Sequence, residues 1–305
     1  MREPKLSVVI VAYKSGRHLG ECMSCLMERN DIGDLLEVVV VDNEVSGATD
    51  REHVFRQRFP GEGIHYLKNT RNGGYGQGNN HGIRHAKAPL ILVMNPDVRL
   101  TGTTPGAICR AFENDSELAL LGMRQLLSTG AKGRSFLWAP GLPAGWLGSA
   151  LLWFSNRFGF FFPHWECIQG SCFAVRKSIF EAAGLFDENV FMYGEERDIH
   201  HRIRALGNVR IACDWSQSYR HLTDIREANP KNSEKQWMVA ADWCERNGIG
   251  ATRYWRAQQR HLKAVLAVSR LKAALGRSSE SLAATERELD LLAGHLAEKK
   301  NEQAK

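Results

Sequence analysis

Four short apolar runs within the first hundred residues constrain the fold of this 305-residue chain more than any other feature. They lie at Leu6–Ala12, Leu36–Val41, Ile64–Leu67 and Leu90–Met94, and segments with helical periodicity separate them. Short runs rich in Val, Ile and Leu are typical of strands that are buried on both faces of a parallel sheet. The pattern therefore predicts an α/β fold with a doubly wound, mostly parallel sheet and right-handed crossover helices.

The pattern is less regular after Thr101. Further elements are expected at Ser171–Val175, Glu195–Leu206 and Val209–Cys213. A short helix is predicted to begin at a capping box formed by Ser178 and Glu181 and to end at Gly184. We expect these elements to complete the domain that the first hundred residues begin.

From about Asn232 onward the sequence is predicted to be helical. The segment Arg253–Arg277 carries seven Arg or Lys and no acid, and six of the seven fall within about 120° of a helical wheel. Apolar residues then recur every seven positions, at Val268, Leu275, Leu282, Leu289 and Leu296. This spacing suggests an oligomerisation helix. Ser278 and Thr285 at alternate positions, and Gly276 within the helix, favour a solvated helical extension instead.

An aromatic, acid-free region precedes the second half of the pattern. Residues 118 to 165 contain no Asp or Glu, and Phe136–Trp165 holds ten of the 27 aromatic residues. The uncharged stretch Ser135–Asn156 is long enough to span a bilayer, which needs roughly 20 apolar residues. Pro140 and Pro143 break any single helix through it, so we expect an interfacial or acceptor-facing segment.

The net charge and the cysteine content indicate what kind of partner the chain binds and in which compartment it works. A formal net charge of +6 suits an anionic partner, which could be nucleic acid, phosphates or a membrane surface. The seven scattered cysteines predict a reducing compartment, and Cys22 and Cys25 lack a second pair at zinc-finger spacing. No secretory signal is expected from the first residues.

Residues that can contact a ligand follow all four apolar runs, where an open parallel sheet binds its ligands. They are Ala12 and Tyr13, then Asp42 and Asn43, then Asn72, Gly74, Gly76 and Asn79 in a glycine-rich stretch, and then Asn95 and Asp97. Asp42 can accept a hydrogen bond from the imide N–H of uracil or thymine. Asp97 offers a hard carboxylate for Mg²⁺ or Mn²⁺ beside a diphosphate. The glycines let backbone approach a ligand and open a helix whose N-terminus favours anions.

A second group of titratable residues lies further along the chain. Glu195, Glu196 and Asp198 fall at the start of a predicted helix, where the helix dipole favours acids in any case. The functional interpretation is a general base beside the diphosphate, with Asp198 fixing the helix or pairing with Arg202. His221, after the next strand, is a candidate ligand for metal or phosphate, although an isolated His is more often a packed or surface residue.

Taken together, these motifs resemble family 2 glycosyltransferases of the GT-A fold over roughly residues 5 to 225. The motifs are Ser7–Tyr13, Val41–Asn43, Asn72–Gly82, Asn95–Asp97, Gly170–Phe173, Phe186–Glu188 and Tyr193–Asp198. Within that family the Asn-Pro-Asp and Asn-Gly-Gly-Tyr-Gly forms look like bacterial rhamnosyltransferases of cell-surface polysaccharide synthesis, including O-antigen. The resemblance implies residues 1–100 as the nucleotide-sugar half, 101–230 as the acceptor-binding and catalytic half, and 231–305 as a helical extension.

The resemblance also implies a reaction and its residues. It implies a dTDP- or UDP-sugar donor, Mn²⁺ or Mg²⁺, and inversion at the anomeric carbon of a sugar such as L-rhamnose. Asp42 would bind the base, Asp97 the metal, His221 the metal or diphosphate, and Glu196 would be the catalytic base. The nucleotide would also contact Ala12, Tyr13, Asn43, Asn72, Gly74, Gly76, Asn79 and Asn95. The acceptor would contact Trp165, Asp198 and Arg202.

Two departures from the family pattern qualify these roles. The base position usually reads Glu-Asp, whereas here it reads Glu195-Glu196, so Glu195 is the alternative base. The nearest match to the processive motif, Gln217–His221, lacks its Trp, which predicts one sugar added per encounter. The expected acceptor is a glycan or polyprenyl-linked glycan, reached in the cytoplasm or peripherally at the inner face of the membrane. Nucleic acid is not expected as a partner.

Other classes of function remain alternatives. A nucleotidyltransferase would need a glycine-rich basic loop after the first strand, and Tyr13–Arg17 has one glycine. A non-catalytic sugar-nucleotide scaffold that uses the C-terminal helix is the second alternative. The misplaced glycines disfavour an NAD enzyme.

Overall fold

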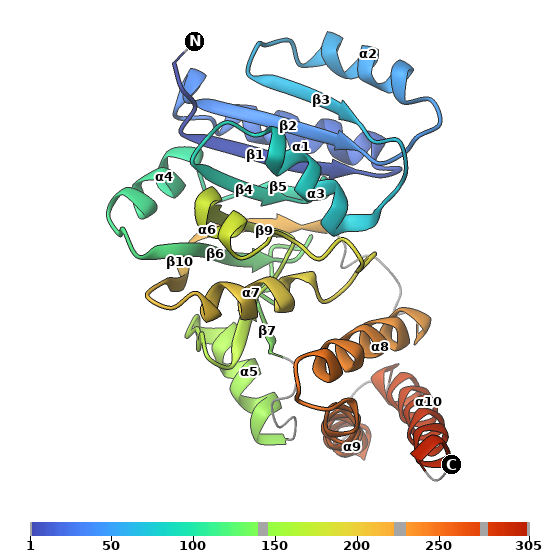
Figure 1. Ribbon diagram of the computed structural model, residues 1–305. Coiled ribbons are helices and arrows are strands. Elements are labelled where there is room, and N and C mark those ends of the chain that lie inside the picture. Colours follow the sequence, from blue (N-terminus) through green and yellow to red (C-terminus); the bar gives the residue numbers. More distant parts are fainter. Residues whose placement is uncertain (1, 140–145, 223–229, 275–279, 304–305) are drawn as a thin grey trace. The chain divides into compact units, whose positions relative to one another are not determined.

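The computed structural model describes residues 2–139, 146–222, 230–274 and 280–303 (Figure 1). The chain divides into two compact units. The first comprises Met1–Leu137 and Glu166–Arg226, and the second comprises Trp138–Trp165 and Glu227–Lys305. This division differs from the expected one, because the aromatic segment Trp138–Trp165 belongs with the C-terminal helices and not with the rest of residues 101–230.

An eight-stranded sheet organises the first unit, in the order β3-β2-β1-β4-β9-β6-β10-β5. Its strands are β1 (Leu6–Ala12), β2 (Leu36–Asp42), β3 (Ile64–Lys68), β4 (Leu90–Met94), β5 (Val98–Leu100), β6 (Leu118–Leu126), β9 (Cys172–Arg176) and β10 (Arg210–His221). β1 to β4 are parallel, as are β6 and β10, whereas β9 and β5 run antiparallel to their neighbours. The mostly parallel α/β sheet confirms the predicted fold class. A separate two-stranded sheet joins β7 (Phe136–Trp138) and β8 (Glu166–Ile168).

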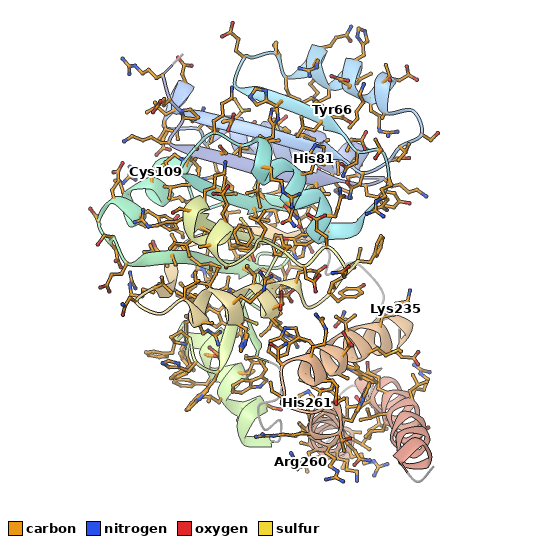
Figure 2. The ribbon with its side chains drawn as sticks, in the orientation of Figure 1. Tyr66, His81, Cys109, Lys235, Arg260 and His261 are labelled. Atoms are coloured by element: carbon orange, nitrogen blue, oxygen red, sulfur yellow. The ribbon has the colours of Figure 1, made fainter. Side chains whose placement is uncertain are left out.

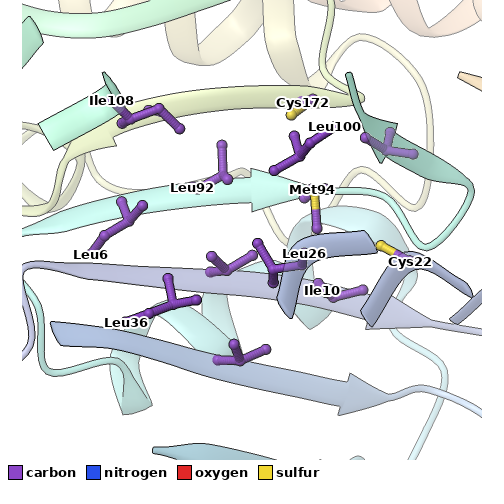
Figure 3. Packing of buried hydrophobic residues seen from close by; sticks show 14 of the residues in the cluster. Leu6, Ile10, Cys22, Leu26, Leu36, Leu92, Met94, Leu100, Ile108 and Cys172 are labelled. Atoms are coloured by element: carbon purple, nitrogen blue, oxygen red, sulfur yellow. The ribbon is translucent and has the colours of Figure 1, made fainter. Parts of the chain in front are cut away.

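Helices cover both faces of the sheet. They are α1 (Gly16–Glu28), α2 (Ala48–Arg58), α3 (Gly74–His85), α4 (Pro105–Glu113), α6 (Lys177–Ala182) and α7 (Glu195–Ala205), with a short 3₁₀ turn at Gly33–Leu35. One face of β1, including Leu6 and Ile10, packs with Leu26 of α1 and Ile108 of α4 in a buried core (Figure 3). α3, α6 and α7 lie together on the other side (Figure 1). Burial on both faces explains why these strands read as unbroken apolar runs.

The short helix α6 begins differently from the prediction. Its first residue is Lys177, its N-cap is Arg176, and no side chain caps it, so the predicted Ser178–Glu181 capping box is wrong. The physical reason is that β9 runs directly into the helix, and the backbone N–H of Lys177 donates to the carbonyl of Pro89 at 2.9 Å. The predicted end at Gly184 is confirmed, since Gly184 has a φ of +85°.

The second unit is helical. Its helices are α5 (Trp146–Phe158), α8 (Pro230–Arg246), α9 (Ala251–Ala274) and α10 (Glu280–Gln303). Buried Trp237, Trp255, Leu262 and Leu292 form a core between α8, α9 and α10. The heptad positions are only partly used here, because Val268 is 50% exposed while Leu289 packs against this core.

Some sequence features of this unit lie outside the described residues. They are Pro140, Pro143, Leu275, Gly276 and Ser278. Within the described ranges, no helix is both long and apolar enough to cross a bilayer.

Candidate functional site

A pocket of about 330 Å³ lies beside Asp42, between α1 and α2 at the end of β2. Asp42 is almost fully buried, and three donors hold its carboxylate. Oδ1 accepts from the backbone N–H of Glu44 at 2.9 Å, and Oδ2 accepts from Tyr66 Oη at 2.7 Å and from Arg51 Nε at 2.9 Å. Burial and the neighbouring Asp42 raise the pKa of the Tyr66 hydroxyl, so it remains a donor. Figure 2 shows Tyr66 on β3.

Tyr13 follows β1 at the mouth of the same region. Its backbone N–H donates to Ser15 Oγ at 2.9 Å, and the next residue, Lys14, has a left-handed φ of +50°. Its ring is 49% exposed, with Lys14 Nζ 5.5 Å from the centroid. Ala12, which also borders the pocket, accepts through its carbonyl from the backbone N–H of Asn43 at 2.8 Å. An exposed aromatic ring can stack on a planar ligand, and a buried carboxylate such as Asp42 can accept one hydrogen bond from it.

Amide side chains hold the glycine-rich stretch in place. Asn43 Nδ2 donates to the carbonyl of Gly74 at 3.0 Å, and Asn72 Oδ1 accepts from the backbone N–H of Gly74 at 3.1 Å. Asn69 in turn donates to Asn43 Oδ1 at 2.6 Å. Asn79, also buried, donates to the carbonyl of Tyr75 at 2.9 Å. These contacts of Asn43, Asn72 and Asn79 are to the protein itself, so a nucleotide-binding role for them stays a prediction.

The glycines allow another part of the chain to approach. Gly74 has a φ of +88°, and a Cβ placed there would overlap the carbonyl oxygen of Phe191. A Cβ at Gly76 would lie 3.1 Å from Phe186 Cβ. The backbone N–H of Tyr75 donates to the carbonyl of Phe191 at 3.0 Å. The close approach that requires these glycines is therefore made by the segment that leads into α7.

Tyr75 links the glycine-rich stretch to the acids of α7. Its hydroxyl donates to the carbonyl of Gly170 at 2.6 Å. A Cβ placed at Gly170 would lie 3.4 Å from Glu196 Cβ, so Glu196 packs directly over this residue. Burial, and then the charges of Glu195 and Glu196, raise the pKa of Tyr75. The neighbouring Ser171 accepts through its carbonyl from the backbone N–H of Asn95 at 2.9 Å, which brings the end of β4 to the same place.

Asp97 and His221 form a pair of potential metal ligands. Asp97 Oδ1 lies 3.4 Å from His221 Nε2, and the two side chains are 15% and 10% exposed. The backbone N–H of Leu222 donates to the carbonyl of Asp97 at 3.1 Å, which fixes the end of β10 against the Asn95–Asp97 turn. A carboxylate suits Mg²⁺ and Mn²⁺, and an imidazole is a common ligand of transition metals. Among the residues that the structure describes, no three His, Cys, Asp or Glu form a metal-binding group. The pair therefore fits a cation that substrate phosphates also ligate.

Glu195 and Glu196 differ sharply in environment. α7 begins at Glu195 directly after two residues with left-handed backbone, Tyr193 (φ +78°) and Gly194 (φ +88°). Glu195 is 4% exposed, and its Oε1 has no hydrogen-bond partner among the described atoms. Burial first, and the charge of Glu196 second, raise the pKa of Glu195 to about 8. Glu195 therefore holds a proton at neutral pH, and Glu196 is the more accessible acid of the two.

The predicted acceptor residues separate into two places. Asp198 accepts from Arg202 Nε at 2.9 Å, and Arg202 also donates to the carbonyl of Ala183, which ties α7 to the end of α6. The pairing of Asp198 with Arg202 was one of the two predicted arrangements. Trp165 belongs to the second unit, is 47% exposed and stacks on Phe162 with centroids 5.9 Å apart. Contact of these residues with an acceptor stays a prediction.

Comparison with known proteins identifies the family. The family model described as glycosyl transferase family 2 matches residues 7–184, more than half of the chain. The chain belongs to glycosyl transferase family 2. The predicted membership is thereby confirmed. The matched residues include the ends of β1, β2 and β4 and stop short of Glu195 and Glu196.

Two curated relatives carry related names. A low-salt glycan biosynthesis hexosyltransferase of Haloferax volcanii is 28% identical over 214 residues, which are 65% of this chain and 61% of that protein. The chain thus spans about three-fifths of that relative's length. An N-acetylglucosaminyl-diphospho-decaprenol L-rhamnosyltransferase of Mycobacterium tuberculosis is 27% identical over 247 residues, covering 74% of this chain and 78% of that one.

Solved structures share the fold of this family 2 chain. A mannosyltransferase of Pyrobaculum calidifontis in complex with GDP-Man and Mn²⁺ has a TM-score of 0.60 at 16% identity, with 97% of this chain and 84% of that chain covered. GalNAc-T7 with UDP, GalNAc and Mn²⁺ has a TM-score of 0.55 at 15% identity, covering 72% and 44%. At these identities the likeness confirms the GT-A-like fold and nothing beyond it.

The contacts of this family 2 site include residues to which the sequence assigned no role. Arg51 and Tyr66 hold Asp42, and Tyr75 and Gly170 join the glycine-rich stretch to Glu196. Tyr75 and Gly170 lay inside recognised motifs, so their positions were a usable signal. No sequence signal marked Arg51, because it is one of several arginines on a surface helix and only the tertiary packing brings it to Asp42.

Proposed function

We propose that this chain transfers a hexosyl residue, L-rhamnosyl being the first candidate, from a nucleotide diphosphosugar to a hydroxyl of a glycan or lipid-linked glycan. The observation that carries the proposal is the meeting of two segments at Gly170–Ser171: Glu196 of α7 packs over Gly170, and the backbone N–H of Asn95, at the end of β4, donates to the carbonyl of Ser171. The names of the two curated relatives, a hexosyltransferase and an L-rhamnosyltransferase that names a diphospho-decaprenol acceptor, support the choice of sugar and acceptor.

The donor's base would occupy the region of Tyr13 and Asp42. An ionised carboxylate offers about four lone-pair sites, and protein donors already use three at Asp42, so one remains for the imide N–H of uracil or thymine. The exposed ring of Tyr13 would stack on the base. This arrangement supports a UDP- or dTDP-sugar as donor.

The diphosphate would lie near Asp97 and His221. These two side chains would hold Mn²⁺ or Mg²⁺ together with phosphate oxygens, and the bound cation would neutralise charge on the departing diphosphate. The Mn²⁺ in the two solved structures of similar fold is compatible with this choice, which does not distinguish the two metals.

Glu196 would act as the general base. As the acceptor oxygen forms its bond to the anomeric carbon, Glu196 takes the hydroxyl proton, and the bond from that carbon to the diphosphate oxygen breaks on the opposite face. One displacement of this kind inverts the anomeric configuration. Neutral Glu195, buried beside it, lowers the like-charge repulsion that a second ionised carboxylate would impose on Glu196. We propose that one sugar is added per encounter.

We also propose that the reaction takes place in the cytoplasm. None of the seven cysteines forms a disulfide, and the buried thiols of Cys22, Cys167 and Cys172 have raised pKa values because burial disfavours the thiolate. Cysteines kept as thiols suit a reducing compartment.

A transfer assay tests the function. Purified chain is incubated with Mn²⁺, a short polyprenyl-diphosphate-linked N-acetylglucosamine and, separately, dTDP-rhamnose, UDP-N-acetylglucosamine, UDP-glucose and GDP-mannose. We expect a glycosylated product by mass spectrometry with one donor, and an inverted anomer by NMR. Retention of configuration would contradict the direct displacement, and binding without turnover of any donor would favour the scaffold alternative.

A further inference from the structure

Helix α5 and the segment after it expose an unusual number of aromatic side chains. Trp153, Phe154, Phe158, Phe160 and Trp165 are 64%, 40%, 51%, 55% and 47% exposed, respectively. Exposure of large aromatic side chains to water is unfavourable, so several of them together usually mark an interaction surface. We call these five residues the aromatic face; all of them belong to the second unit.

Most members of the aromatic face touch one another. Phe154 packs on Phe158 with ring centroids 4.8 Å apart and stacks on Phe160 at 5.4 Å. Trp153 meets Phe158 edge-on at 6.3 Å. Four of the rings therefore form one continuous apolar surface, in contrast to the single exposed apolar residues that any protein carries.

The other side of α5 is fixed within the second unit. Ser155 is fully buried, and Ser149 Oγ lies 2.8 Å from His261 Nδ1 on α9. On a helical wheel Trp153, Phe154 and Phe158 fall within about 140° of one another. The packed side of α5 is thus already used, and the aromatic face is the side that is left.

The charge around the aromatic face is positive. The guanidinium of Arg157 lies 5.5 Å from the centre of the Phe158 ring, and residues 138 to 165, which belong to the same unit, contain no acid. Helix α9 contacts α5 through His261 and contains no acid either. Its Arg256, Arg260 and Lys263 are exposed and lie along one side of the helix. Arg260 and His261 are labelled on α9 in Figure 2.

We propose that the aromatic face and the exposed cations of α9 dock this chain on a bilayer that contains anionic phospholipid. Trp and Phe suit the boundary between headgroups and acyl chains, and Arg and Lys suit the phosphates above it. The acid-free sequence is the argument for this occupant, since a sugar or a second protein gives no reason to exclude acids over the 28 residues from 138 to 165 that the second unit contributes to this stretch. The inference deepens the proposed function, because the lipid-linked acceptor would lie in that bilayer.

Vesicle co-sedimentation of the full chain tests whether the aromatic face contributes to membrane binding. The probe is vesicles of phosphatidylcholine with about one third phosphatidylglycerol, without donor or acceptor. We expect the double variant Trp153→Ser/Phe158→Ser to lower the partition coefficient by about tenfold or more, because two interfacial anchors are lost. Met238→Ser on α8, which removes a 53% exposed apolar side chain from the same unit, is the matched control and should bind like the wild type.

A second pair of variants tests the charges. We expect Arg256→Gln/Arg260→Gln/Lys263→Gln to weaken binding to the anionic vesicles by about fivefold per charge. The same variant should leave binding to pure phosphatidylcholine unchanged. Lys235→Gln on α8 is the control for a cation elsewhere in the unit. Unchanged binding by either test variant would overturn the proposal, as would a wild-type chain that stays in the supernatant.

Two further outcomes identify another occupant and also overturn the proposal. If Trp153→Ser/Phe158→Ser binds vesicles normally but loses transfer to a lipid-free acceptor, the aromatic face holds sugar. If it binds normally but changes a dimer into a monomer, the face is a subunit interface. Since vesicle binding is measured without substrates, failure of the proposed function leaves this test intact. Loss of vesicle binding with transfer to a lipid-free acceptor retained supports the docking role.

Discussion

The end of β2 and the start of α7 each present a buried carboxylate, yet the two regions are built in opposite ways. At β2, Asp42 receives hydrogen bonds from Glu44, Arg51 and Tyr66, and neither Asp42 nor the residue on either side of it has left-handed backbone. At α7, Glu195 follows two left-handed residues, and one of its oxygens has no partner among the described atoms.

This difference suggests different uses. A carboxylate whose donors come from its own fold keeps its position and charge whether or not a ligand arrives, which suits recognition. A buried acid with an unpaired oxygen and neighbouring backbone strain is maintained at a cost in stability, and such features concentrate where chemistry occurs. We therefore expect substitutions at α7 to affect turnover, and substitutions around Asp42 to affect stability and donor binding.

The largest effect is expected from Glu196. Glu196→Gln removes the proposed base while retaining the shape of the side chain, so turnover should fall by about 10²–10⁴-fold. Steady-state kinetics with saturating donor measure this, and circular dichroism checks the fold. Glu195→Gln should cost much less, because Glu195 already carries a proton, and Glu181→Gln on α6 is the control. Near-normal turnover by a folded Glu196→Gln enzyme would place the chemistry elsewhere.

The next effect concerns Asp97. Asp97→Asn weakens the oxygen ligand beside His221, so turnover should fall by about a hundredfold, consistent with a metal contribution of several kcal/mol. Mn²⁺ affinity in the presence of UDP, followed by electron paramagnetic resonance, should fall in parallel. Asp34→Asn serves as a remote control. Equal Mn²⁺ affinity in the two variants would remove Asp97 from the proposed metal site.

The strands of the first hundred residues could be predicted from the sequence. β1, β2 and β4 are almost fully buried, so their apolar runs are continuous and easily distinguished from helices. The antiparallel insertion of β9 between β4 and β6 was not predicted, because the direction of a strand depends on the path of the chain and not on its composition. The grouping of Trp138–Trp165 with the C-terminal helices was not predicted either, because it also depends on the path of the chain.

For the candidate site, the sequence predicted the motifs but not most of the contacts between them. Asp97 and His221 are 124 positions apart, and the family resemblance paired them before the structure brought them to 3.4 Å. The reason for the glycines was not accessible, since the carbonyl of Phe191 approaches Gly74 from 117 positions away. A contact of this kind depends on tertiary packing, which leaves no local pattern in either segment.

The pH dependence of the free energy of unfolding tests whether Glu195 is protonated in the folded chain, unlike a carboxylate that serves recognition. Its pKa is raised from 4.5 to about 8 in the folded chain, so between these values the folded state keeps a proton that the unfolded chain releases. This contribution to stability is complete below about pH 4.5 and is lost as the pH rises through about 8. A tenfold change in proton affinity corresponds to about 1.4 kcal/mol, so a loss on the order of 5 kcal/mol is expected across the whole range.

Glu195→Gln provides the comparison for this measurement. The variant cannot ionise, so its free energy of unfolding should fall less than that of the wild type between about pH 5 and about pH 9. Urea unfolding at several pH values measures both chains, and the difference between them cancels the titration of all other groups. Parallel pH profiles would show that Glu195 is ionised in the folded state and that the contrast with Asp42 is weaker than proposed.

The smallest effect is expected at the other end of the comparison. Tyr66→Phe removes one of three donors from the buried carboxylate of Asp42, which should lower the free energy of unfolding by about 2 kcal/mol, as expected for a hydrogen bond to a charged group. Turnover at saturating donor should hardly change, while the donor KM rises a few-fold because Asp42 is held less firmly. Tyr13→Phe removes the hydroxyl of a 49% exposed ring and should leave stability unaltered. If Tyr66→Phe instead reduced turnover without raising KM, Asp42 and its donors would belong with the chemistry of α7, and the separation between a recognition carboxylate and a reactive one would fail.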